Sequence, residues 1–185
     1  NTAMAQIASE AMGVPFHMIE VNEGDTDIAT FDVGAYASRQ TYVAGTAVKK
    51  AGLKIKAIVL DRASEMLHRD ADRLDTYNGY VVDAETLEQL IPIADVAYDC
   101  YYNRGKFADA CMMIEANASH CPTTQALTYV CGFAEVEVDM ETGYVNLKKF
   151  YTSCDCGTLI NPLAAKCQLT GGSIMACGYG LTEQV

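Results

Sequence analysis

Hydrophobic and polar residues are arranged along the first part of the chain in a way that predicts a helix, a strand and a turn. Residues 2–12 carry apolar side chains three and four positions apart, which is the spacing of one helix face, and Gly13 and Pro15 end that helix. Residues 16–21 alternate between apolar and polar as a strand does, and residues 22–25 contain the turn formers Asn, Gly and Asp.

The middle of the chain predicts two more helices, with a charged stretch and a strand between them. The first of these helices starts near Ser38 and runs past Ala51 at helical apolar spacing. Residues 61–73 are rich in charge, so we expect them to be exposed. Residues 80–82 favour a short strand, and Asp83 with the acidic residues that follow it is typical of a helix start.

The last third of the chain predicts mainly strands. Residues 107–120 and 128–138 have strand patterns, and residues 144–154 form the return strand after a tight loop at 139–143. Asn161 and Pro162 then open a final helix, because proline is tolerated at the first helical position. Strands and helices mix without strict alternation, which indicates an α+β fold rather than a doubly wound sheet.

Composition and charge narrow the class of protein. A chain of 185 residues with 50% hydrophobic and 20% charged residues has the length and composition of one globular domain. Its net charge of −11 repels the phosphate backbone of nucleic acids and anionic membrane surfaces, so neither is an expected partner. The apolar runs are shorter than the roughly 20 residues of a membrane span, and no signal peptide is visible. The sequence therefore predicts a cytoplasmic protein.

The cysteines raise the question of disulfides or a metal site. They stand at positions 100, 111, 121, 131, 154, 156, 167 and 177. Without a signal peptide, reduced thiols are favoured. Iron–sulfur and zinc sites usually have two residues between paired cysteines, whereas the last four are separated by one, ten and nine residues. We therefore predict no metal site built from protein residues, and we interpret the cysteines as small buried hydrophobic residues.

A candidate binding site lies where the second helix begins. A loop containing Gly34 delivers Ser38 just before Arg39, Gln40 and Thr41. The first turn of a helix has unpaired N–H groups and the positive end of the dipole, so these donors together suit an anionic, oxygen-rich ligand such as a phosphate or a pterin. An ordinary helix start capped by Ser38 explains the same residues equally well.

Short motifs then follow one another in two blocks. The first block contains Asp25–Asp27, Gly34–Thr41 and Gly45–Val48. The second block contains Phe133–Asp139, Glu141–Gly143, Asp155–Gly157, Ile160–Pro162, Gln168 and Gly171–Gly172. With the first helix, these blocks resemble the molybdopterin domain in the large subunit of the xanthine dehydrogenase and aldehyde oxidase family. The resemblance is weak across residues 60–125.

The resemblance implies which residues bind the cofactor. Tyr36, Ala37, Ser38, Arg39, Gln40 and Thr41 match the family's cofactor-binding loop. Gln168 matches a glutamine whose amide holds the ligands of molybdenum or the pterin, and Gly171 with Gly172 would let the backbone pack closely. The implied cofactor is molybdopterin with molybdenum, as a dinucleotide, and iron–sulfur clusters and FAD are expected on partner domains or subunits.

The resemblance also implies an incomplete site. The family's base is a glutamate in a Gly-Glu-Pro context, and this chain contains no such motif. We therefore expect no catalytic residue here, and we expect residues 1–185 to be a single partial molybdopterin-binding domain, either a fragment or one piece of a split subunit. Its expected partners are the remainder of the molybdenum domain and the iron–sulfur and FAD modules.

The implied activity is xanthine dehydrogenase-like hydroxylation of a purine or another small N-heterocycle, with oxygen taken from water. Nicotinate dehydrogenase and 4-hydroxybenzoyl-CoA reductase are related alternatives that this segment does not separate. A noncatalytic anion-binding or assembly module is the alternative from another class, because the same helix start would serve it.

Three other polar clusters have simpler explanations. Asp25 and Asp27 are interpreted as a capped turn rather than a catalytic carboxylate pair. The acidic residues at 135, 137 and 139 share one face of a strand and are interpreted as solvated. His120 and Cys121 are adjacent on a predicted strand and would point to opposite faces, so we do not expect a Cys–His pair.

Overall fold

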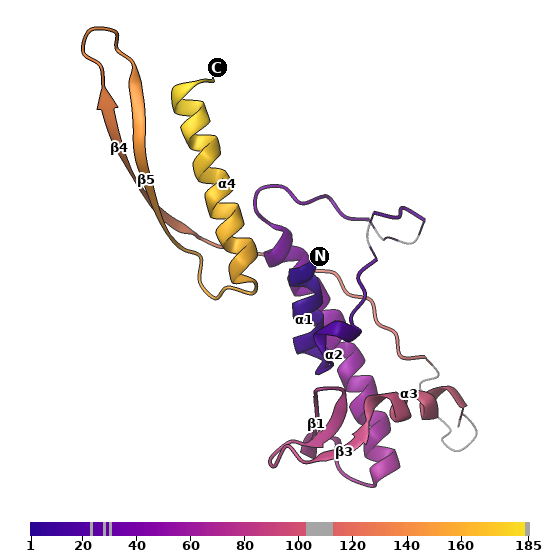
Figure 1. The fold of residues 1–185 in the computed structure, drawn as a ribbon. Coiled ribbons are helices and arrows are strands. Elements are labelled where there is room, and N and C mark those ends of the chain that lie inside the picture. Colours follow the sequence, from indigo (N-terminus) through magenta and orange to yellow (C-terminus); the bar gives the residue numbers. More distant parts are fainter. Residues whose placement is uncertain (23, 28, 30, 103–112, 184–185) are drawn as a thin grey trace. The chain divides into compact units, whose positions relative to one another are not determined.

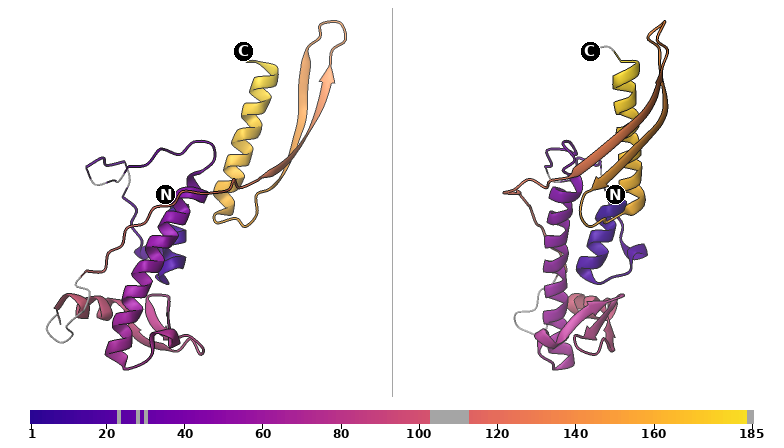
Figure 2. Two further views of the ribbon diagram at one scale, coloured as in Figure 1. Left: turned by 180° about the vertical axis from the view of Figure 1, so that it is seen from behind. Right: turned by 90° about the vertical axis from the view of Figure 1, so that its left-hand side faces the viewer.

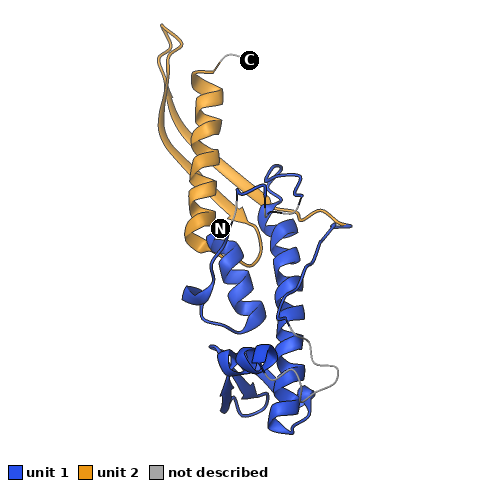
Figure 3. Ribbon diagram, turned by 90° about the vertical axis from the view of Figure 1, so that its right-hand side faces the viewer, with its two compact units in different colours: residues 1–123 blue, residues 124–185 orange. Residues whose placement is uncertain are grey.

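The structure, a computed structural model, describes residues 1–22, 24–27, 29, 31–102 and 113–183. The chain divides into two compact units, residues 1–123 and residues 124–185, which are described separately below (Figure 3). Helices occur in both units, and each unit has one small antiparallel sheet (Figure 1). The predicted α+β class is therefore confirmed. In the described part of the chain, none of the helices combines the length and apolar character that crossing a membrane requires.

A short helix lies beside a long helix in the first unit (Figure 2). Helix α1, Thr2–Met12, ends at Gly13 with φ of 68°, as the sequence predicts. Helix α2, Gln40–Leu67, is 28 residues long and continues well beyond the predicted stretch. Glycines on α2 allow the close approach of α1, because a Cβ at Gly52 would stand 2.8 Å from the Ala11 Cβ.

The expectation that residues 61–73 are exposed is wrong for the last turns of α2. Arg62 is only 5% exposed and Ala63 is fully buried, because α2 continues through them against the core. The Arg62 guanidinium donates to Asp99 and, at 2.7 Å, to Glu65 Oε2, so its charge is paired inside the protein. The core of the unit consists of Val59, Ala63, Leu74, Val81 and Val96.

A three-stranded antiparallel sheet follows α2, in the order β1-β2-β3. Its strands are β1, Leu74–Tyr77, β2, Tyr80–Asp83, and β3, Gln89–Pro92, and helix α3, Ile93–Tyr102, comes next. The strand predicted at residues 80–82 is confirmed. The helix predicted to start at Asp83 is wrong: Asp83 Oδ1 accepts from the amides of Glu85 and Thr86, and the resulting turn leads into β3 instead.

Two further strand predictions differ from the structure. Residues 16–18 form a short 3-10 helix, η1, Phe16–Met18, where a strand was expected. Of the strand predicted at 107–120, residues 107–112 lie outside the described residues, and residues 113–120 have no regular structure. The backbone carbonyl of Asn117 accepts from Lys54 Nζ on α2 at 2.8 Å. Contact with a helix therefore replaces pairing with a strand in this segment.

The second unit is a β-hairpin with one helix. Strands β4, Tyr129–Val138, and β5, Val145–Asp155, pair antiparallel, and Gly143 with φ of 73° closes the loop between them, as the sequence predicts. Helix α4, Pro162–Leu181, begins where Asn161 Oδ1 accepts from the Ala164 amide at 2.9 Å, which confirms the predicted helix start.

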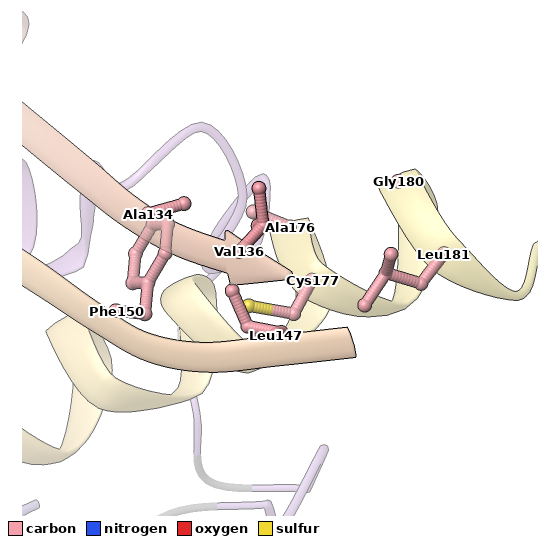
Figure 4. Close-up of a pocket in the computed structure, with 8 residues that line it drawn as sticks. All are labelled: Ala134, Val136, Leu147, Phe150, Ala176, Cys177, Gly180 and Leu181. Atoms are coloured by element: carbon pink, nitrogen blue, oxygen red, sulfur yellow. The ribbon is translucent and has the colours of Figure 1, made fainter. Parts of the chain in front are cut away.

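Helix α4 packs on one face of the hairpin. The Thr152 and Ser173 hydroxyls lie 2.9 Å apart across this contact. A shallow apolar hollow lies between the hairpin and the helix (Figure 4); it is lined by Ala134, Val136, Leu147, Phe150, Ala176, Cys177, Gly180 and Leu181. No described residue of this unit is buried, so the unit has no core of its own.

Candidate functional site

The candidate loop reaches α2 through a sharp bend. Gly34 has φ of 106°, and the successive residues Ala37 and Ser38 have φ of 52° and 55°. Left-handed angles at residues other than glycine cost about 1–3 kcal/mol each and occur preferentially at functional sites. The bend therefore holds strain at the residues that the sequence selects for binding.

Ser38 is not the cap of the second helix. Helix α2 begins at Gln40, two residues later than predicted, and the N-cap position is held by Arg39, whose side chain makes no capping hydrogen bond. The ordinary explanation of Ser38 as a helix cap is thus wrong, because its left-handed backbone turns the chain before the helix starts. This leaves the first-turn donors of α2 without a serine cap.

Tyr36 holds the Arg39 guanidinium. Arg39 Nη1 donates to the Tyr36 hydroxyl at 3.3 Å, and the guanidinium carbon lies 5.3 Å from the centre of the tyrosine ring. The Arg39 amide also donates to the Tyr36 carbonyl at 3.3 Å. A cation over an aromatic face gains about 0.5–1 kcal/mol at an exposed site, so the guanidinium is oriented before any ligand binds.

Backbone donors lie beside this cation. The first intrahelical bond of α2 runs from the Val43 amide to the Arg39 carbonyl at 2.8 Å, so the amides of Gln40 and Thr41 precede the regular hydrogen-bond pattern. The side chains of Gln40 and Thr41 are exposed, and Arg39 is half-buried. The bend therefore presents a positive charge, amide donors and a helix dipole on one accessible surface, which suits an anionic ligand.

The carboxylates in the preceding loop serve the loop itself. Asp25 Oδ1 accepts from the Asp27 amide at 2.9 Å, which confirms the capped-turn interpretation for the Asp25 carboxylate. Asp32 Oδ1 accepts from the Gly34 amide at 2.7 Å in the same way. These carboxylates stabilise the loop locally.

Gln168 lies on α4 of the second unit, with an exposed side chain. Its participation in one site with Tyr36–Thr41 stays a prediction. A Cβ placed at Gly171 or Gly172 would meet no described atom within 4 Å. Within the described residues, the close packing predicted at these glycines therefore has no partner.

The acidic residues on β4 are part of a solvated, charge-paired surface, as predicted. Glu137 pairs with Lys148 at 2.5 Å and Glu135 lies 3.9 Å from Lys149 on the neighbouring strand. Asp139 is in the hairpin loop rather than on the strand, and hydrogen bonds from the Glu141 amide and then from Thr142 lower the pKa of its carboxyl. This explains the acidic pattern without catalysis.

Most described cysteines are not buried, contrary to the sequence interpretation. Only Cys100 is buried in the described part of the chain, while Cys154 and Cys177 are half-buried and the others are exposed. Cys111 lies outside the described residues. Among the residues that the structure describes, no three His, Cys, Asp or Glu side chains gather as metal ligands.

Sequence reasoning missed one contact near the candidate site. The His120 ring lies edge-on to Tyr42, in the first turn of α2, with 6.3 Å between ring centres, and His120 Nδ1 is 3.2 Å from Lys50 Nζ. Lys50 and His120 are 70 positions apart, so no local pattern could bring them together. His120 is paired with α2 rather than with Cys121.

Comparison with known proteins gives consistent results over the whole chain. Residues 1–185 match the model of the molybdopterin cofactor-binding domain family. The chain is 33% identical to the xanthine dehydrogenase molybdenum-binding subunit of Escherichia coli O157:H7, over all of the chain and 24% of that protein. It is also 33% identical to the carbon monoxide dehydrogenase large chain of Hydrogenophaga pseudoflava, over all of the chain and 23% of that protein.

A solved structure shares the fold. Quinoline 2-oxidoreductase from Pseudomonas putida 86 superposes with a TM-score of 0.85 at 29% identity, over 92% of this chain and 22% of that protein's chain. The chain thus spans about a quarter of the length of the relatives that it matches.

Proposed function

Because the chain belongs to the molybdopterin cofactor-binding domain family, we propose that it forms part of the cofactor site of a molybdenum hydroxylase. Tyr36–Thr41 and Gln168 are the residues that bind the cofactor in this proposal. The observation that carries it is the donor-rich bend before α2, which lies inside the matched family region.

The bend fits the chemistry of molybdopterin. The cofactor carries phosphate oxygens and the oxygens and nitrogens of a pterin, which accept hydrogen bonds from guanidinium and amide donors. Arg39 supplies the guanidinium, and the amides of Gln40 and Thr41 supply backbone donors. The bound group itself supplies the redox chemistry, while these residues bind and orient it.

For the complete protein, we propose xanthine dehydrogenase-like hydroxylation of a purine or another small N-heterocycle, with oxygen from water. The 33% identity to a xanthine dehydrogenase subunit supports this activity. An equal identity to a carbon monoxide dehydrogenase large chain supports carbon monoxide oxidation as the competing activity. A family resemblance does not fix the substrate, because substrate choice depends on pocket residues.

The remaining parts of the proposal concern partners. The relatives are about four times as long as this chain, so the rest of the molybdenum domain is an expected partner. Electrons would leave through iron–sulfur centres to FAD on other domains or subunits, in the cytoplasm. The glutamate base of the family would come from outside residues 1–185, since no Gly-Glu-Pro motif occurs here.

The complete protein, purified with its natural partners, allows a direct test. Molybdenum and pterin should each be present in about stoichiometric amounts, and xanthine or hypoxanthine should reduce an artificial electron acceptor. The hydroxylated product formed in ¹⁸O-labelled water should carry the label. Turnover of carbon monoxide but not of purines would contradict the proposed substrate class and support carbon monoxide oxidation instead. A protein without molybdenum and pterin when isolated from molybdate-supplemented cells would favour the noncatalytic module.

A further inference from the structure

The two cysteines at the end of β5 lie together, and the proposed function does not use them. Cys154 is on β5, and Cys156 directly follows Asp155, the last residue of the strand. The two thiols lie close enough to interact, since Cys156 is one of the groups that raise the pKa of the Cys154 thiol. In the part of the chain that the structure describes, no third ligand-type side chain joins them in a possible metal site. The pair is therefore a dithiol.

The backbone at this point can bring the two sulfurs within bonding distance. In a regular strand, Cα atoms two residues apart are separated by about 6.6 Å, near the upper limit for a disulfide. Here the chain bends directly after the pair, because the Gly157 amide donates to Asp155 Oδ1 at 3.1 Å and Gly157 has φ of 75°. Cys156 lies outside the strand, so it can approach Cys154 without breaking a ladder pair.

The two thiols differ in accessibility. Cys156 is exposed, whereas Cys154 is half-buried. Burial raises the pKa of the Cys154 thiol, and the neighbouring Cys156 and Asp155 raise it further. The Cys154 thiol therefore loses its proton less readily than an ordinary cysteine, and the exposed Cys156 is the sulfur that a reagent in solution reaches first.

We propose that Cys154 and Cys156 form a reversible disulfide by exchange with a small-molecule disulfide of the glutathione type. The Cys156 thiolate attacks one sulfur of the oxidant, forms a mixed disulfide and releases the first thiol. Cys154, as its thiolate, then attacks Cys156 Sγ and releases the second thiol. Two electrons pass from the cysteine pair to the oxidant, and the two cysteine protons go to the released thiolates.

The position of the pair gives the disulfide a structural consequence. The segment after Cys156 leads to Asn161, which caps α4 through its bond to the Ala164 amide. A bond between the cysteines would restrict this connection between β5 and the helix that carries Gln168. Because the bridge is exposed and spans one residue, it is expected to be easily reduced, unlike a structural disulfide.

The sequence around the pair makes the test specific. Trypsin cleaves after Lys149 and Lys166, so residues 150–166 form one peptide with Cys154 and Cys156 as its only cysteines. The complete folded protein is equilibrated with mixtures of reduced and oxidised glutathione, quenched with acid, alkylated and digested. We expect this peptide to lose two hydrogens and to resist alkylation. In the folded protein, the fraction of oxidised glutathione needed for this should be several-fold lower than for a synthetic peptide of the same sequence.

Variants separate the proposed exchange from general thiol oxidation. Cys154→Ser should stop the reaction at the mixed disulfide, leaving glutathione on Cys156, whereas Cys131→Ser should leave oxidation of the pair unchanged. The proposal is overturned if the peptide stays doubly alkylated while other cysteines oxidise, or if the folded protein and the synthetic peptide oxidise alike. Cross-links from Cys154 or Cys156 to other peptides would overturn it as well.

Discussion

Single residues decide the geometry of the bend before α2. Ala37 and Ser38 adopt left-handed angles that the sequence does not favour, and Tyr36 fixes Arg39 over its ring. Neither feature follows from the spacing of polar residues, because both depend on the path of the chain. The consecutive donors in the loop suggested the segment, and its resemblance to a known family selected it as the predicted binding site.

The first prediction concerns Gln40 and Gln168. Changing both to alanine in the complete protein should lower molybdenum and pterin content together, while iron–sulfur and flavin content stay constant. A hydrogen bond to a charged group contributes about 1.5–3 kcal/mol, so each loss weakens cofactor binding by roughly tenfold or more. Metal per folded molecule is the measurement, and Gln125→Ala, also exposed, is the control. Unchanged cofactor content in the double variant would remove these residues from the site.

The second prediction concerns Asp83, whose pKa is lowered by hydrogen bonds from the Thr86 and Glu85 amides. A carboxyl whose pKa is lower in the folded state than in the unfolded state stabilises the folded protein at pH values above its unfolded-state pKa. That stabilisation is lost as the pH falls through the pKa of the folded state. The stability of β1–β3 against urea, measured in the complete protein, should therefore decrease below about pH 4. Asp83→Asn should flatten this acid limb and lower stability at neutral pH. An identical pH profile in the variant would contradict the assignment.

At the scale of elements, the contact between α1 and α2 depends on two glycines in different surroundings. A Cβ at Gly45 would stand 2.7 Å from Ile7 Cδ1, the movable end of a side chain, whereas at Gly52 it would meet the Ala11 Cβ. The Ala11 Cβ is bonded directly to the backbone of α1 and cannot rotate away, so only a side chain at Gly52 would force the helices apart.

These surroundings give a matched pair of variants. Gly45→Ala should be neutral or stabilise α2 by up to about 1 kcal/mol, because alanine has the higher helix propensity. Gly52→Ala should destabilise the contact by about 1–3 kcal/mol through overpacking. Hydrogen exchange of the α1 and α2 amides in the complete protein measures both effects. Equal protection in the two variants would show that the contact at Gly52 is looser than the structure indicates.

At the scale of the whole molecule, the two units differ in how much apolar surface they bury. The first has a core around Val81 and Val96, whereas the second exposes Phe133, Tyr151 and Ile174 at 69%, 55% and 67%. A two-stranded hairpin is marginally stable at best without further packing. Since the chain spans about a quarter of its relatives, the remainder of such a protein is the expected cover for these faces.

The prediction at this scale concerns the chain produced alone. Residues 1–185 should bind a hydrophobic dye or self-associate, and the amides of β4, β5 and α4 should exchange faster than those of α2. Adding the rest of the subunit should remove the dye signal. A monomer that melts sharply and protects both units equally would show that the second unit needs no cover.

The sequence by itself determined the elements whose hydrogen bonds are local. Helix α1 with its glycine end, the hairpin closed by Gly143 and the start of α4 at Asn161 all follow from contacts within a few residues. The sequence also singled out residues 36–41 as the predicted cofactor-binding loop, because their donors are adjacent and the motifs around them resemble a known family in a fixed order.

Only the tertiary structure decided the rest, because distant residues supply the free energy. Arg62 is buried since Asp99, 37 positions away, pairs with it, so a charged stretch lies against the core. Asp83 caps a turn because β2 and β3 pair with each other. The segment around Asn117 contacts Lys54 on α2 instead of pairing with a strand. Local propensity describes what a segment can form, and the partner available in space selects which form is stable.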